Sequence, residues 1–363
     1  MQEYEQGINP LSRLCWYILR TFGKGKQFIV PAGIRQSSKL LFIDSGDITD
    51  LLYAAPIVNY FKSYYPVIKT TILARNEDVE LVKAIMKVNR IIMYNRNQLR
   101  MFKTDYLALI RKLRRQNIET AILLGRRFSL ERFLLAFGCG ARIRIGFTHP
   151  LAFPFVNCEM RFAENGYEGD KIKGVLRLVG PKMHESLKEV SLSSKETNHA
   201  RQLIHFRKPE KDLLTVGIDP SRGKTRHRIT PGNIAYLANN LASRRKVKFL
   251  ILANPWEEKL VGKLAEEIKG EIFDLKPANA KEAVSLLSQC DLFISGNTNL
   301  FHFAAALHVP TIGLFTKYDD RRWVPEGAEK VRILKGASGE KLKLKNFFTL
   351  VEEVLSTRNT VTV

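Results

Sequence analysis

The sequence has few cysteines and no long apolar run, and each absence excludes a class of protein. Its four cysteines, Cys15, Cys139, Cys158 and Cys290, lie far apart, form no Cys-x-x-Cys pair and have no histidine at zinc-ligand spacing. This pattern argues against a disulfide framework and a structural metal, and it favours a reducing, cytoplasmic compartment. No apolar run reaches the roughly 18 residues of a membrane-spanning helix, and no secretory signal pattern opens the chain. We therefore expect a protein that is neither secreted nor transmembrane.

Acidic residues are scarce relative to basic ones. The chain has 58 Lys and Arg against 36 Asp and Glu, a formal net charge of +22 and an isoelectric point near 9.9. Such a charge favours anionic partners, which include nucleic acids, phosphorylated metabolites and acidic membrane surfaces.

Two sequence patterns are missing as well. No strand is followed by Gly-x-Gly-x-x-Gly, which argues against a dinucleotide-binding oxidoreductase, and no short repeat indicates a solenoid.

What remains is the composition of an ordinary globular protein with room for two domains. The 363 residues are 45% hydrophobic and 26% charged. Short β-rich apolar runs alternate with helical stretches in two series, which predicts an α/β protein with two Rossmann-like parallel sheets. The expected strands are Leu40–Ile43, Ile68–Leu73, Ile91–Tyr94 and Thr120–Leu124, then Leu214–Ile218, Val247–Leu252, Glu271–Asp274, Leu292–Ser295 and Thr311–Phe315.

Four segments follow from this alternation. We expect an amphipathic N-terminal segment at 1–26, a first Rossmann-like domain at 27–208, a second at 209–335, and a C-terminal helical segment at 336–363 that could pack on either domain. In segment 1–26, Trp16 and Tyr17 flank an apolar helical face that lies opposite Arg13, Arg20 and Lys24. This pattern is typical of a helix at a membrane interface, and equally of a helix packed on its own domain.

Ligands bind at the carboxyl ends of strands in open parallel sheets. The loop after the first strand of each series is therefore a candidate site. In Asp44-Ser45-Gly46-Asp47, Gly46 permits a tight turn, and Asp47 could act as a base or simply cap the next helix. The loop 219–231 ends with Thr230 and Pro231 at a helix start, which suits an anion. Its polar and basic residues include Ser221, Arg222, Lys224 and Arg228, and a solvated basic loop is the alternative interpretation.

Two further loops lie in the second series. Glu257 and Glu258 follow Asn254-Pro255-Trp256, where they could contact a ribose or only complement a helix dipole. In 295–302, the free N–H groups of a helix start could hold a diphosphate. Asn297, Thr298 and Asn299 lie at that start, with His302 one turn further along.

These loops and the phrases around them resemble the lipopolysaccharide heptosyltransferase family, the family 9 glycosyltransferases of GT-B fold. The resemblance runs from Lys39 to about Gly327. The matching phrases, in order, are DSGDITDLLYAAPIVNYFKSYYP, LRRQNIETAILLGRRFSLERFLLAFGCGARIRIGF, VGIDPSRGKTRHRITPGNIAYLANNL and GNTNLFHFAAALHVPTIGLFTKYDDRRWVPEG.

The resemblance implies an inverting, metal-independent transfer of heptose or a related sugar to a lipopolysaccharide core hydroxyl, without a cofactor. The donor would be a nucleotide diphosphate sugar, usually ADP-heptose, held by the second domain across a cleft from the acceptor-binding first domain. Asp47 matches the general base and Arg228 a cation for the leaving diphosphate. The implied donor contacts are Ser221, Arg222, Lys224, Glu257, Glu258, Asn297, Thr298, Asn299 and His302, and the implied acceptor contacts are Gly46, Arg126 and Arg127.

Five residues, at three places in the sequence, depart from the family pattern. Asn297-Thr298-Asn299-Leu300 stands where the family reads Asp-Thr-Gly-Pro, Arg228 replaces a Lys, and Lys317 replaces a Pro. A family member with another nucleotide-sugar donor, or with weak or no catalysis, is therefore an alternative.

A protein of another class, a basic nucleic-acid binder, is the second alternative. Residues 99–145 contain 11 Lys and Arg against 3 acids. No nucleic-acid-binding motif accompanies this density, and it suits equally a phosphorylated glycolipid at an anionic membrane. We expect a cytoplasmic enzyme that lies peripherally on the cytoplasmic face of the inner membrane.

Overall fold

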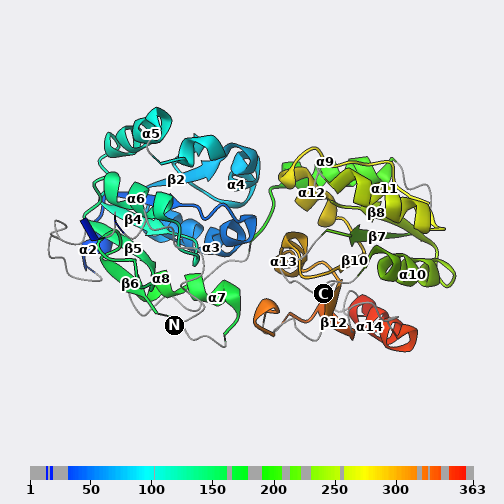
Figure 1. Ribbon diagram of the computed structural model, residues 1–363. Helices are drawn as coiled ribbons and strands as arrows, with labels where there is room; N and C mark the ends of the chain where they lie inside the picture. Colours follow the sequence, from blue (N-terminus) through cyan, green and yellow to red (C-terminus); the bar gives the residue numbers. More distant parts are fainter. Residues whose placement is uncertain are drawn as a thin grey trace. The chain divides into compact units, whose positions relative to one another are not determined.

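The computed structural model divides the chain into two compact units, one of residues 1–164 with 170–188 and the other of residues 165–169 with 189–363 (Figure 1). The structure describes residues 14, 17–18, 32–101, 103–161, 166–178, 190–206, 213–221, 230–253, 257–316, 321–325, 328–336 and 343–356. Each unit contains a six-stranded sheet whose strand pairs are all parallel. The prediction of two Rossmann-like parallel-sheet domains is confirmed.

The sheet of the first unit has the order β3-β2-β1-β4-β5-β6. Its strands are β1 (Lys39–Ile43), β2 (Lys69–Arg75), β3 (Arg90–Tyr94), β4 (Thr120–Leu123), β5 (Ile143–Phe147) and β6 (Cys158–Met160). The helices are α2 (Ala32–Arg35), α3 (Ile48–Tyr64), α4 (Val79–Ile85), α5 (Thr104–Arg114), α6 (Leu130–Gly138), α7 (Glu168–Ile172) and α8 (Gly174–Arg177), and short 3-10 turns lie at Asn76–Asp78 and Arg96–Leu99. Helices α5 and α6 cover a core that includes Leu41, Ile43 and Leu123.

The sheet of the second unit has the order β12-β11-β10-β7-β8-β9. Its strands are β7 (Leu214–Asp219), β8 (Val247–Ile251), β9 (Glu271–Ile272), β10 (Leu292–Ser295), β11 (Thr311–Thr316) and β12 (Val331–Gly336). The helices are α9 (Ser194–His205), α10 (Pro231–Ala242), α11 (Glu258–Glu267), α12 (Ala280–Leu287), α13 (Asn299–Ala306) and α14 (Leu344–Ser356), with a 3-10 turn at Arg321–Trp323. Side chains of α10, α11 and α14 share one core cluster with the central strands.

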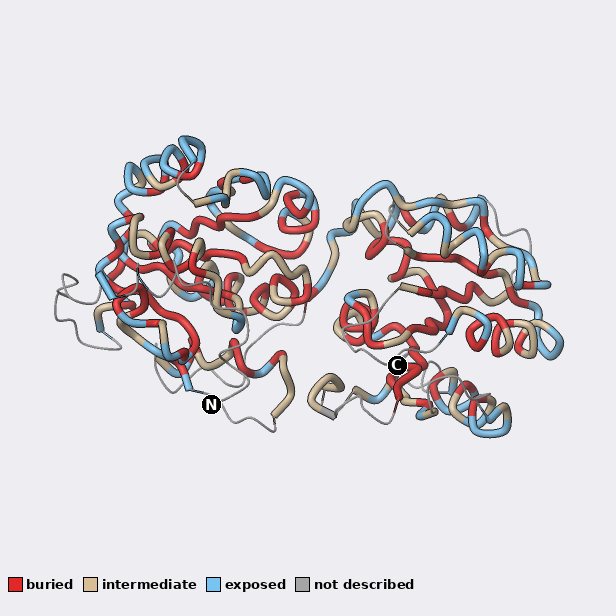
Figure 2. Tube along the Cα trace, viewed as in Figure 1, coloured by how far each residue is buried: buried red, intermediate tan, exposed pale blue. Residues whose placement is uncertain are grey.

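Both sheets have the same topology. In each, the first strand along the chain lies at the centre, paired with the second on one side and the fourth on the other. The central strands are buried along almost their whole length (Figure 2), as expected for parallel strands covered on both faces. The point between the first and fourth strands, where the winding changes direction, is the usual ligand position of such sheets.

Helix α9 lies on the other side of the predicted domain limit, and α14 packs on one of the two domains that the sequence allowed. A division after residue 208 assigns α9 to the first domain, but α9 packs against α12 in the second unit. The reason is its apolar stripe, because Ala200 and Ile204 are buried while most of the helix is polar. Helix α14 packs on β12, β11 and α10 of the second unit, through Phe347, Val351 and Val354.

Candidate functional site

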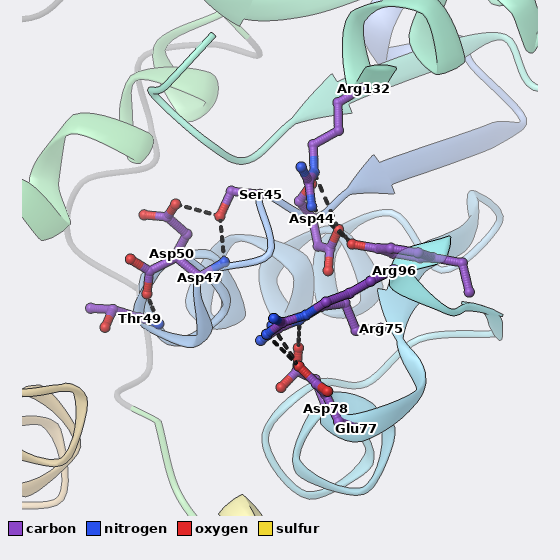
Figure 3. A network of polar contacts seen from close by, with 11 residues as sticks. Asp44, Ser45, Asp47, Thr49, Asp50, Arg75, Glu77, Asp78, Arg96 and Arg132 are labelled. Atoms are coloured by element: carbon purple, nitrogen blue, oxygen red, sulfur yellow. Dashed lines mark hydrogen bonds and ion pairs between the residues drawn. The ribbon is translucent and has the colours of Figure 1, made fainter. Parts of the chain in front are cut away.

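In the first unit, the turn between β1 and α3 holds Asp47 at the start of a helix. Gly46 takes a positive φ of 76°, a conformation that glycine adopts without strain. Asp47 Oδ1 accepts a hydrogen bond from Thr49 N at 2.9 Å, so Asp47 is the N-cap of α3. Ser45 braces the same turn, since its hydroxyl accepts from Asp47 N at 3.0 Å and donates to Asp50 Oδ2 at 2.5 Å (Figure 3). Asp47 is half-buried, so it keeps some exposure to solvent.

Beneath this turn lies a buried cluster of Asp44, Tyr94 and Arg132. The Tyr94 hydroxyl, at the end of β3, donates to Asp44 Oδ1 at 2.6 Å. Arg132 on α6 donates from Nε to the Asp44 carbonyl oxygen at 2.7 Å and from Nη2 to the Tyr94 hydroxyl at 2.9 Å. Burial raises the pKa of Asp44, while the hydrogen bond from Tyr94 and the charge of Arg132 act in the opposite direction.

Arg75, the last residue of β2, lies near this cluster. Its guanidinium pairs with Asp78 at 2.7 Å and with Glu77 at 2.6 Å, next to Arg96 (Figure 3). Burial raises the pKa of Asp78 against the opposing charge of Arg75. The arginine therefore has carboxylate partners of its own on the β2 side of the turn.

The loop after β4 touches the Asp47 turn. A Cβ added to Gly125 would lie 2.3 Å from Ser45 Cβ, so the two backbones meet at close range. Arg126 and Arg127 follow Gly125 and are exposed. The predicted acceptor contacts Gly46, Arg126 and Arg127 thus all lie at the carboxyl ends of the central strands β1 and β4.

In the second unit, the loops after β7 and β10 meet at the equivalent point. Asp219 is buried, and its Oδ1 accepts from Ser221 N at 2.8 Å. Burial raises the pKa of Asp219 to about 6, although hydrogen bonds from Ser221 and Thr298 lower it. Thr298 caps α13 by accepting from Phe301 N at 3.3 Å, and its hydroxyl lies 2.9 Å from Ser295 Oγ. The N-terminus of α13 therefore lies beside a carboxyl group whose pKa is raised by burial.

The two predicted glutamates have different surroundings. The Ser221 hydroxyl donates to Glu257 Oε2 at 2.6 Å, which ties Glu257 to the loop after β7. Glu258 instead pairs with Lys276 at 3.3 Å, and both side chains are exposed. Glu257 therefore shares the Asp219 site, whereas Glu258 lies at the surface of α11.

The remaining predicted residues of this loop differ in exposure. Asn297 is only 3% exposed, and its two amide atoms have no hydrogen-bond partner among the residues that the structure describes. Asn299 is the exposed first residue of α13. His302 is fully buried, with its ring 5.8 Å from that of Trp323. Thr298 is thus the member of this loop that hydrogen-bonds to the Asp219 carboxyl, and Asn297 directly precedes it.

Several predicted features lie outside the described residues. Arg222, Lys224 and Arg228 fall in 222–229, and Lys317 in 317–320. Of segment 1–26, only Leu14, Tyr17 and Ile18 are described. All three are helical and exposed, at 56%, 62% and 51%. In the described parts of the chain, no helix has the length and apolar character to cross a membrane, and no three His, Cys, Asp or Glu side chains gather as a metal site.

Tyr94 and Arg132 lie outside the predicted site loops, whereas Asp219 and Ser295 begin two of these loops without a predicted role. Tyr94, Asp219 and Ser295 each end a strand, so the rule about carboxyl ends of strands could have found them. Arg132 gave no signal of its own, because it is one of 11 basic residues in 99–145.

Two Rossmann-like units, each with polar loops at the winding change of its sheet, are the architecture of the GT-B fold. The sequence profile of glycosyltransferase family 9 (heptosyltransferase) matches residues 106–348. The chain belongs to this family.

Individual relatives agree with this membership. A lipopolysaccharide core heptosyltransferase, OpsX of Haemophilus influenzae, is 23% identical over 309 residues, which cover 82% of this chain and 84% of that protein. A family 9 glycosyl transferase from Veillonella parvula has a TM-score of 0.73 at 14% identity, covering 88% of this chain and 97% of its own. The Escherichia coli heptosyltransferase WaaC, solved with ADP, has a TM-score of 0.64 at 17% identity, covering 87% and 99%.

Proposed function

We propose that the chain transfers heptose from ADP-heptose to a hydroxyl of the lipopolysaccharide core, with inversion at the anomeric carbon and without a metal. The family supports heptosyl transfer. The name of the Haemophilus relative supports a lipopolysaccharide core acceptor, and the ADP in the WaaC structure supports an adenine nucleotide donor.

The observation that carries the proposal is the position of Asp47. It lies at the carboxyl end of the central strand, half-buried, in a turn held by hydrogen bonds on both sides. In the proposed reaction, Asp47 takes the proton of the acceptor hydroxyl while that oxygen attacks the anomeric carbon. The bond from that carbon to the phosphate oxygen breaks at the same time, and the nucleoside diphosphate leaves with the electron pair.

The second unit would hold the leaving diphosphate. The N-terminus of α13, capped by Thr298, offers free N–H groups, and Arg228 is the predicted cation. Glu257, fixed by Ser221, is the proposed ribose contact.

The test is a transfer assay with ADP-heptose and a heptose-deficient core acceptor, with the product's anomeric configuration read by NMR. Calorimetry with ADP, GDP and UDP on wild type and Arg228→Ala measures the donor site separately. We expect ADP to bind most tightly and Arg228→Ala to weaken it. Retained configuration, or equal affinity for the three nucleotides, would contradict the mechanism or the donor.

A different nucleotide-sugar donor is the second candidate function, and Asn297 is the observation that favours it. An amide stands where the family has a carboxylate, and its two polar atoms are buried without partners among the described residues. Transfer from a GDP- or UDP-sugar, but not from ADP-heptose, would establish this alternative.

Attachment to an anionic membrane completes the proposal. Exposed Leu14, Tyr17 and Ile18 lie at helical spacing on one face, as in a helix that inserts its apolar side into a membrane interface. The enzyme would then lie on the cytoplasmic face of the inner membrane, where the lipid-linked acceptor is made.

A further inference from the structure

One arginine, Arg132, holds the turn that carries Asp47. Arg132 reaches from α6 to the loop after β1, where its Nε donates to the backbone oxygen of Asp44 at 2.7 Å. Its Nη2 donates to the Tyr94 hydroxyl at 2.9 Å, and that hydroxyl donates to Asp44 Oδ1 at 2.6 Å. Segments from β1, β3 and α6 therefore meet at Asp44, three residues before Asp47.

The same guanidinium also bounds the turn sterically. A Cβ added to Gly46 would lie 2.6 Å from Arg132 Nη2, so the arginine packs directly against the backbone of Gly46. Gly46 has φ of 76° and precedes Asp47. The arginine thus contacts the turn by hydrogen bond at Asp44 and by van der Waals packing at Gly46.

The cluster itself is closed to substrate. Asp44 is 1% exposed, Tyr94 is 1% exposed, and the Arg132 side chain is 17% exposed with its donors directed at the loop. Buried hydrogen bonds of this kind gain strength from the low local dielectric, and they hold one geometry. The cluster can therefore affect the reaction only through the turn that carries Asp47.

We propose that Arg132 and Tyr94, through Asp44, are positioning residues that set the place of the Asp47 carboxylate. The inference rests on the proposed role of Asp47 as the base. A displacement of about 1 Å at a reacting group can lower turnover by about 10²-fold, so loss of the arginine is expected to act on kcat.

The experiment is a double-mutant cycle. We expect Arg132→Met to lower kcat by about 10- to 100-fold with donor affinity unchanged, and Arg132→Lys to recover part of it. In an Asp47→Asn background, the same Arg132→Met change is expected to cost less than about 2-fold, because the base that it positions is gone. Arg142→Met is the matched control, since Arg142 is exposed and precedes β5 at the opposite edge of the sheet.

A second measurement does not depend on activity. Hydrogen exchange of residues 44–52 is expected to be faster in Arg132→Met and unchanged in Arg142→Met, while the exchange of β7 and β10 stays as in wild type. An equal loss of kcat in both Asp47 backgrounds, or unchanged exchange in the turn, overturns the positioning role. A wild type that transfers no sugar, or an Asp47→Asn variant with full turnover, contradicts the proposed function instead, and the exchange result still decides whether Arg132 fixes the turn.

Discussion

Gly125 and Ser45 touch so closely that the glycine has no room for a side chain. A Cβ on Gly125 would lie 2.3 Å from Ser45 Cβ and 3.2 Å from its Cα. Since Ser45 accepts the hydrogen bond from Asp47 N, the contact transmits the position of the β4 loop to the proposed base. The two central loops of the first unit are therefore in direct contact.

Gly125→Ala is expected to displace the Asp47 turn and to lower both stability and turnover. Overpacking of this kind costs about 1–3 kcal/mol, measured as the free energy of unfolding in urea. Gly174→Ala is the control, because Gly174 lies in the same unit and its added Cβ would meet nothing within 4 Å. Equal effects of the two substitutions would show that the contact at Ser45 does not matter.

Asp47→Asn is expected to separate the two interpretations of Asp47. An asparagine oxygen can still cap α3, so stability should change by no more than a few tenths of a kcal/mol. Turnover should fall by about 10² or more, because an amide cannot accept the proton. Asp47→Ala should lose the cap in addition, at about 1 kcal/mol of unfolding free energy. Near-normal turnover in Asp47→Asn would reduce Asp47 to a helix cap.

Asp219→Asn is expected to change how stability depends on pH. Burial raises the pKa of Asp219 to about 6 in the folded chain, above its ordinary value of 3.8. The folded state therefore binds this proton more tightly, and the stabilisation is complete below pH 3.8 and lost as the pH rises through about 6. The variant keeps an acceptor for Ser221 and does not titrate. Its stability relative to wild type should rise with pH by up to about 3 kcal/mol, measured by urea unfolding between pH 4 and 8. A difference that is constant with pH would contradict the raised pKa.

Deletion of residues 1–26 is expected to weaken membrane attachment and leave thermal stability nearly unchanged. Leu14, Tyr17 and Ile18 are each more than half exposed, as expected for a helix whose apolar side meets a membrane. Each basic residue near an anionic surface adds about 1 kcal/mol, so sedimentation with anionic vesicles should fall most clearly at low salt. A large drop in melting temperature with unchanged vesicle binding would favour a packed helix.

Most of the strands that the sequence predicted contain an uninterrupted run of three or more apolar or β-branched residues. Strand β5 was missed because Arg144 interrupts it. The guanidinium is nevertheless buried, since it donates to the carbonyl oxygens of Phe155, Ala141 and Pro154 at 2.6, 2.8 and 3.0 Å. Strand β12 was missed because Arg332 and Lys335 lie in an edge strand, and β6 has only three residues. In each case a charge or a short length hides the strand, and only the tertiary partners explain it.

The candidate site likewise has one part that the sequence predicted and one part that it did not. Loops that follow strands could be found from the alternation alone, and those around Asp47 and Thr298 lie at the winding change as expected. The cluster of Asp44, Tyr94 and Arg132 could not be found in this way, because its hydrogen-bonded pairs are far apart in the sequence. Tyr94 and Asp44 are 50 residues apart, Arg132 and Asp44 are 88 apart, and Arg132 and Tyr94 are 38 apart. Its existence depends on β3, β1 and α6 converging in the folded sheet.

The separate hydrophobic interiors of the two units have a consequence for cooperativity. One cluster joins α5 and α6 to the first sheet, and another joins α10 and α14 to the second. A ligand stabilises only the structure whose unfolding destroys its binding site. A nucleotide held by the second unit should therefore delay the melting of that interior alone, and calorimetric unfolding should resolve into two transitions of which one responds to the donor.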